Sequence, residues 1–246
     1  MPKFSKSRIG HAPGVRFDKV VLTRGGRPVF DGLTLELGEH RIGIVGNNGS
    51  GKSSLLRLIN GLLMPEAGSV RVCGYETREH RKQLPELAGF LFQNPEHQIL
   101  FPTAGEEIAF GLREAGLDAL EVSKRVRAIL ESHSVEDWEH KPVEKLSDGQ
   151  KQLLCILALM AMEPQILLLD EPFASLDLPT RARLSAEILA APQQVIIASH
   201  DFELLQQFER LIWLDCGKIV ADGAPASVLR QYRNAAGQVA EMAAMQ

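Results

Sequence analysis

Hydrophobic and polar residues alternate along the first 45 residues with the two-residue period of half-buried β-strands. The alternation is loose over 15–22 and strict over 33–37, and it predicts two strands separated by a turn at the glycine-rich run 24–28. Residues 40–45 predict a third strand. A glycine-rich turn follows and leads into a helix over 52–62, where apolar residues recur with helical spacing.

From about residue 94 to 162 the pattern becomes helical. Val122, Val126, Ile129 and Leu130 are spaced so that they fall on one face of a helix, and the charged residues between them form its solvated face. We therefore expect a helical subdomain over about 94–162, within a single domain that spans 1–246.

Strands and helices alternate after this helical part. Continuous apolar runs at 165–170 and 194–199 predict buried strands, with helices at 181–189 and from Phe202 onward. The alternation indicates an α/β fold with a mostly parallel sheet.

The C-terminal end of the chain predicts a closing hairpin, formed by the runs 210–215 and 218–223. The last dozen residues are compatible with either a short helix or a frayed end.

Composition and charge narrow the function classes. The 246 residues are 45% hydrophobic and 24% charged, as in soluble globular proteins. A net charge of -4 argues against nucleic-acid binding, which needs a basic surface. The longest apolar run, 153–162, is too short to cross a membrane, and residues 1–14 show no secretory signal. The three scattered cysteines predict reduced and mostly buried thiols.

One glycine-rich segment carries a specific chemical pattern. Residues 46–53 match G-x-x-x-x-G-K-[ST] between a predicted strand and a predicted helix. Glycines let backbone N–H groups surround phosphate oxygens, and the helix N-terminus adds partial positive charge. Lys52 can reach the β- and γ-phosphates, and Ser53 can ligate Mg²⁺. The candidate ATP-binding residues are Gly46, Asn47, Asn48, Gly49, Ser50, Gly51, Lys52, Ser53 and Ser54.

A second candidate group follows the apolar run 166–169, which ends in Asp170 and Glu171. Ligands of open α/β sheets lie at the carboxyl ends of strands. Asp170 is placed to hold Mg²⁺ through water, and Glu171 to polarise the attacking water.

Further motifs make the chain similar to a known family. Residues 146–150 (LSDGQ) resemble the LSGGQ signature of ATP-binding-cassette (ABC) ATPases. Around this segment lie Gln93 after an apolar run, Ser175-Leu176-Asp177 after the acidic strand, and Ser199-His200-Asp201. The order of these motifs is that of the family, and the resemblance covers essentially the whole chain.

The resemblance implies a P-loop NTPase (RecA-like) core with a parallel sheet, an N-terminal antiparallel β subdomain and a helical subdomain. It implies ATP and Mg²⁺ as cofactors, with Gln93 joining Ser53 and Asp170 at the metal. Glu171 and His200 are the catalytic candidates, and Asp177 is the residue expected to couple two sites across a dimer. The signature is expected to complete the ATP site of a second chain, through Leu146, Ser147, Asp148, Gly149 and Gln150.

Two positions depart from the family pattern. Asp148 stands where a glycine is usual, and because a carboxylate repels phosphate, its side chain is expected to point away. The aromatic residue that stacks on adenine is missing near Thr23 and Arg24. Arg24 could stack through its guanidinium plane instead.

The segments 92–99 and 106–112 resemble the ATPases of energy-coupling-factor (ECF) importers for vitamins and transition-metal ions. The resemblance implies a peripheral subunit at the cytoplasmic face of a bacterial-type inner membrane. Its expected partners are a second copy or a paralogous ATPase, a membrane coupling (T) subunit and a substrate-capturing (S) subunit. The chain is most similar to the biotin branch, with cobalt or nickel uptake as the rival.

Two other functions are alternatives for a chain with these motifs. An ABC ATPase of DNA repair would carry a long coiled-coil or zinc-bearing insertion between Gln93 and Leu146, and the sequence has none there. A nucleotide sensor with little turnover is the other alternative, which the Asp148 change would permit.

Overall fold

The computed structural model describes residues 14–244. The first layer of the fold is an antiparallel sheet. β1 (Val15–Arg24) pairs with β2 (Arg27–Leu37) and with β4 (Ala67–Val72), and β5 (Tyr75–Glu76) completes the order β2-β1-β4-β5. The two predicted strands and their turn are confirmed.

The second layer is a six-stranded sheet with the order β10-β9-β3-β8-β7-β6. All neighbouring pairs are parallel except β9 and β10, which form the predicted closing hairpin. The α/β class and the mostly parallel sheet are confirmed. The strands are β3 (Arg41–Val45), β6 (Ala88–Leu91), β7 (Ile166–Asp170), β8 (Gln194–Ala198), β9 (Arg210–Asp215) and β10 (Lys218–Gly223).

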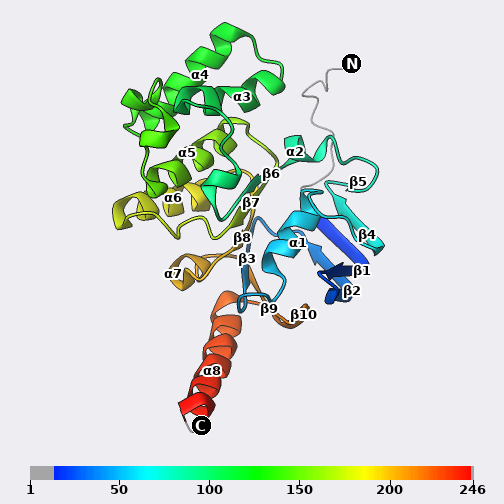
Figure 1. Ribbon diagram of the computed structural model, residues 1–246. Helices are drawn as coiled ribbons and strands as arrows, with labels where there is room; N and C mark the ends of the chain where they lie inside the picture. The colour runs from blue at the N-terminus through cyan, green and yellow to red at the C-terminus, as the bar shows by residue number, and fades with distance from the viewer. Residues whose placement is uncertain (1–13, 245–246) are drawn as a thin grey trace.

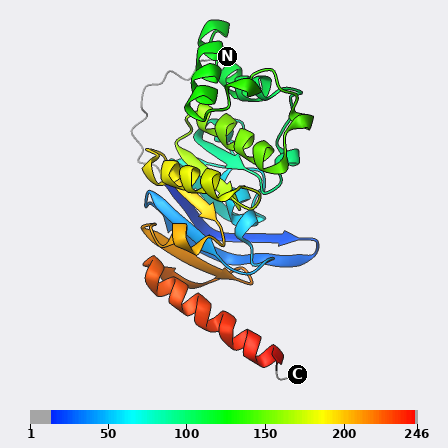
Figure 2. The same cartoon turned by 90° about the vertical axis from the view of Figure 1, so that its left-hand side faces the viewer.

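Helices cover both faces of this sheet. Figures 1 and 2 show α3 and α4 gathered at one end of the molecule and α8 projecting from the other. Three 3-10 turns, 95–97, 136–138 and 143–145, lie in the helical part. The α-helices are α1 (Lys52–Ile59), α2 (Leu84–Leu87), α3 (Ala104–Glu114), α4 (Ala119–Ser132), α5 (Asp148–Ala161), α6 (Leu178–Ala190), α7 (Phe202–Leu205) and α8 (Pro225–Ala244).

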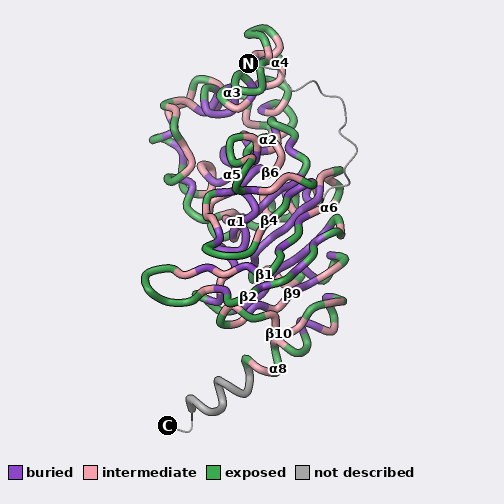
Figure 3. Tube along the Cα trace, turned by 90° about the vertical axis from the view of Figure 1, so that its right-hand side faces the viewer, coloured by how far each residue is buried: buried purple, intermediate pink, exposed green. Residues whose placement is uncertain are grey.

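The parallel sheet separates two hydrophobic cores. Ile166 and Leu168 of β7 face the core shared with α1 and the antiparallel sheet, and Leu167 and Leu169 face the core shared with α5. Both sets are buried, which explains why the strand is continuously apolar rather than alternating. Figure 3 shows the buried residues concentrated along these strands.

Two helix boundaries differ by three residues from the predicted ones. α1 ends at Ile59 rather than 62 because Gly61 adopts a left-handed φ of 76°, which terminates a helix. α6 begins at Leu178 rather than 181 because Asp177 caps it by accepting from the Thr180 N–H at 2.8 Å. α7 spans only four residues.

The C-terminal prediction resolves in favour of a helix, since α8 continues through Ala244. Cys73 and Cys155 are buried as predicted, but Cys216 is exposed because it lies in the turn of the β9–β10 hairpin. The interpretation of residues 1–14 as lacking a secretory signal concerns 1–13, which lie outside the described residues.

Candidate nucleotide site

The predicted site residues follow four adjacent parallel strands, β3, β8, β7 and β6. The P-loop follows β3, His200 follows β8, Asp170 and Glu171 end β7, and Gln93 follows β6. Because parallel strands place their carboxyl ends at one edge, motifs that are far apart in the sequence meet there.

The P-loop forms a cradle with no room for side chains at its first glycine. A Cβ on Gly46 would lie 2.0 Å from the backbone oxygen of Leu214, and Gly46 has a φ of 150°. Gly51 precedes α1 with a φ of 111°. The free N–H groups at the start of α1 therefore face the turn, as an anion site requires.

Lys52 lies folded back over this turn. Its Nζ donates to the backbone oxygens of Gly46 at 2.6 Å and Asn47 at 3.2 Å. Burial lowers the pKa of Lys52, while the negative charges of Glu171 and Asp170 oppose that shift. The ammonium group is held by carbonyl oxygens that phosphate oxygens can replace.

Ser53 and Asp170 lie together across the sheet edge. The Ser53 hydroxyl donates to Oδ1 of Asp170 at 3.0 Å. Burial raises the pKa of Asp170, and the Ser53 hydrogen bond and the charges of Arg57 and Lys52 act against it. A hydroxyl and a buried carboxylate are hard oxygen donors, so this pair fits Mg²⁺. Among the described residues no hydrogen bond joins Gln93 to either of them.

Glu171 and His200 approach each other at the same edge. Nε2 of His200 lies 3.6 Å from Oε1 of Glu171. Burial raises the pKa of Glu171, opposed mainly by the Lys52 charge, whereas burial and then Lys52 lower the pKa of His200. The imidazole is therefore neutral at physiological pH. Glu171 has a left-handed φ of 50°, held by its N–H bond to the Ala198 oxygen.

The signature residues start α5. Ser147 and Gln150 form a capping box, in which each side chain accepts from the other's backbone N–H, at 3.3 Å and 3.0 Å. Leu146 is buried, whereas Ser147 and Asp148 are exposed. Gly149 packs so closely on the 175–176 turn that a Cβ would lie 2.6 Å from the Ser175 oxygen. No hydrogen bond within 14–244 links these residues to the chain's own P-loop.

Comparison with known proteins identifies the family. Residues 31–174 match the family model described as ABC transporter. The chain belongs to this family. It is 48% identical over 87% of its length to the biotin transport ATP-binding protein BioM of Rhodobacter capsulatus, covering 91% of that protein. It is 36% identical over 83% of its length to the energy-coupling factor transporter ATP-binding protein EcfA of Methanothermobacter thermautotrophicus, covering 68% of it.

A solved structure agrees with this assignment. The dimeric, post-hydrolysis ATP-binding cassette MJ0796, bound to ADP and Pi, superposes on this ABC ATPase with a TM-score of 0.76. The two sequences are 25% identical, and the match covers 86% of this chain and 98% of the other. The predicted membership of the ABC ATPase family, the predicted fold class and the predicted activity as an ATP hydrolase are confirmed.

The structure of this ABC ATPase shows two contacts at the site that the sequence did not predict. Arg181 of α6 pairs with both carboxylate oxygens of Asp201, at 2.8 and 2.9 Å, and so connects the helix capped by Asp177 to the residue after His200. Tyr232 of α8 reaches Asn47. Neither has a local sequence signal, because each is made between elements distant in the chain.

The two residues expected near adenine, Thr23 and Arg24, lie at the end of β1. Thr23 is bonded through its N–H and its hydroxyl to the Glu66 carboxylate, at 3.0 Å each. Arg24 ends β1 and is exposed. Its stacking on adenine remains a prediction.

Alanine in place of Gly46 is expected to lower the free energy of unfolding by about 2–3 kcal/mol and to impair ATP binding, because the new Cβ overlaps the Leu214 carbonyl. Gly49→Ala is the matched control. Gly49 also has a positive φ, of 82°, but a Cβ added there would meet open space. The Gly49→Ala variant should therefore lose only about 1–2 kcal/mol of the free energy of unfolding. Urea denaturation measures both, and equal losses would contradict the close contact.

Proposed function

We propose that this chain is the ATP-hydrolysing, energy-coupling subunit of an ECF-type importer for biotin. The observation that carries the proposal is the division of the site. The P-loop, Asp170, Glu171 and His200 share one sheet edge, while the signature start of α5 is exposed and makes no hydrogen bond to that P-loop within the described residues. Two chains, each supplying what the other lacks, form a complete site.

The residues at the sheet edge have distinct roles in hydrolysis. Lys52 and the 46–54 turn bind the β- and γ-phosphates. Ser53, Asp170 and Gln93 would hold the Mg²⁺, which neutralises phosphate charge. Glu171 takes the proton of the attacking water, helped by a pKa that burial has raised toward neutrality. Neutral His200, 3.6 Å from Glu171, orients that water and contacts the γ-phosphate.

Closure of the dimer is the step that does mechanical work. Ser147 and Gly149 of one copy meet the phosphate bound by Lys52 of the other, and Asp177 couples the two sites. The helical subdomain, about 94–162, moves with nucleotide state through the link at Gln93. The partner we propose is a second copy, because each chain carries one P-loop and one signature, and each therefore supplies the half-site that the other needs.

The membrane partner docks on an apolar surface of the helical subdomain, which we call the docking surface and define by Leu100, Phe101 and Phe110. Leu100 is 72% exposed and Phe110 37%, and the Phe101 and Phe110 rings lie 5.0 Å apart. The buried Glu107 carboxylate accepts from the Leu100 and Phe101 N–H groups at 2.9 Å each. The surface is therefore preorganised to receive apolar helices.

Within the described residues, no helix is both long enough and apolar enough to span a bilayer. The similarity to the transport ATP-binding proteins BioM and EcfA supports a peripheral subunit, which we place at the cytoplasmic face of the inner membrane. A T subunit occupies the docking surface, and an S subunit captures biotin. The assignment of biotin is supported by the similarity to the biotin transport ATP-binding protein BioM.

Glutamate in place of Leu100 should abolish co-purification with the membrane subunits, because a charge enters an apolar interface. The ATPase activity of the isolated chain should stay unchanged. Val220→Glu, at another exposed apolar position (49%) on β10, is the control. Retention of the partners by Leu100→Glu would contradict the docking surface.

Uptake of labelled biotin by cells with and without the complex tests the assignment of the solute. Uptake of cobalt or nickel, and not of biotin, would replace biotin as the assigned solute.

A further inference from the structure

Helix α8 reaches the nucleotide site through Tyr232. The Tyr232 hydroxyl donates a hydrogen bond to Oδ1 of Asn47, the second residue of the P-loop motif, at 3.4 Å. The backbone oxygen of the same Asn47 accepts from Nζ of Lys52 at 3.2 Å and from the Ser50 N–H at 3.1 Å. A residue that shapes the phosphate-binding turn is thus tied to the C-terminal helix.

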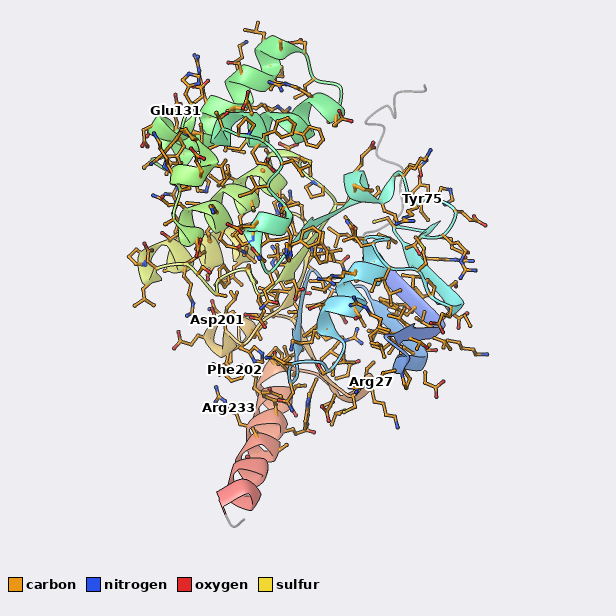
Figure 4. All side chains as sticks on the ribbon, viewed as in Figure 1. Arg27, Tyr75, Glu131, Asp201, Phe202 and Arg233 are labelled. Atoms are coloured by element: carbon orange, nitrogen blue, oxygen red, sulfur yellow. The ribbon has the colours of Figure 1, made fainter. Side chains whose placement is uncertain are left out.

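The Tyr232 ring also touches the segment that carries His200. It lies edge-on to Phe202, two residues after His200, with ring centroids 5.9 Å apart, and edge-on to Trp213 of β9 at 5.5 Å. The neighbouring Arg233 places its guanidinium 5.3 Å from the Phe202 ring, and Figure 4 shows these two side chains together where α8 joins the body. One half-buried tyrosine therefore contacts three elements.

The charges around the hydroxyl fit this placement. Burial raises the pKa of Tyr232, and the negative charges of Asp215 and Glu171 raise it further. The hydroxyl consequently stays protonated and able to donate. Its bond to Asn47 is longer than the usual 2.7–2.8 Å of such bonds, so a small movement of the P-loop makes or breaks it.

We propose that Tyr232 is a positioning residue of the nucleotide site, which holds Asn47 and Phe202 in one arrangement and makes α8 respond to bound nucleotide. This inference rests on the ATP-binding role proposed above and is independent of the transported solute. Tyr232 preorganises the P-loop, so its hydroxyl contributes to ATP affinity and not to the chemical step.

Phenylalanine in place of Tyr232 tests the hydroxyl alone in the full chain. We expect the KM for Mg·ATP to rise about 2–5-fold, the lower part of the range for one hydrogen bond because this bond is long, with kcat unchanged. Tyr75→Phe is the matched control, because Tyr75 is the other tyrosine of the chain. Tyr75 lies on β5, where its ring packs against His80, away from the site (Figure 4). A Tyr232→Phe variant with the parent's KM overturns the proposal.

Trp213 supplies a readout that a merely structural role would not move. Its indole nitrogen is buried and has no hydrogen-bond partner among the described residues, so its emission is sensitive to any rearrangement beside Tyr232. With Trp138→Phe in all variants, Mg·ATP should shift the Trp213 emission of the parent, and Tyr232→Ala should remove that shift. An unchanged shift in a folded Tyr232→Ala variant contradicts the proposal. Failure of the parent to bind Mg·ATP would be a different result: it would overturn the proposed function, and with it this inference.

Discussion

Glutamine in place of Glu171 is expected to lower ATP turnover by about 10²–10⁴-fold, the contribution of a positioned general base, and to leave Mg·ATP bound. Glutamine keeps the size of the side chain but accepts no proton. Glu171 lies 3.6 Å from His200, and burial raises its pKa, so the carboxylate is suited to accept a proton from the attacking water. Steady-state phosphate release and ATP binding, measured on the same preparation, check the expectation.

Glu163→Gln is the matched control for this variant. Glu163 is also a glutamate with a left-handed φ, 49° against 50° for Glu171, but it is exposed and pairs with Arg125 at 3.7 Å. Any cost of placing glutamine in that backbone conformation is therefore the same in both variants. Equal turnover by Glu171→Gln and the parent would remove Glu171 from the mechanism.

Two inactive variants should restore activity when mixed, if ATP is shared between two copies. Lys52→Ala removes the phosphate-binding ammonium. Ser147→Asp preserves the helix cap, since aspartate caps as well as serine, but places a negative charge where the partner's phosphate would bind. Each variant alone is expected to lose about 10²–10³ in turnover.

In an equal mixture half of the dimers contain both variants, and each mixed dimer has one site with an intact Lys52 and an intact Ser147. Turnover should therefore recover to about a quarter of the parent's value. A mixture of Lys52→Ala with Glu171→Gln is the control. Both changes lie in the same half of the site, so no intact site forms. Recovery in neither mixture would contradict the shared site.

The local motifs and elements could be predicted because their causes are local. The P-loop is a run of consecutive residues whose glycines permit the turn, and β7 reads as a buried strand because each of its residues is apolar up to Asp170. The end of α1 was predicted too far along the chain although Gly61 carried the signal. The start of α6 was missed although Asp177 and Pro179 mark it.

The strand order lay beyond sequence reasoning. β3 lies between β9 and β8, and β7 between β8 and β6, so neighbours in the sheet are far apart in the chain. Packing of two cores against the sheet selects this order, and no local pattern encodes it. The family resemblance implied that Ser53 and Asp170 share a site and that Glu171 and His200 act together, but the contacts themselves, at 3.0 and 3.6 Å, follow from that order.

Residue spacing was thus sufficient to establish the α/β class, the phosphate-binding turn and the family, because turns, strands and helix starts depend on a few consecutive side chains. The contact of Tyr232 with Asn47, the pairing of Arg181 with Asp201 and the perturbed pKa values at the sheet edge needed the folded chain. They arise from burial and from distances between remote segments, which exist only once the sheet and its two cores have assembled.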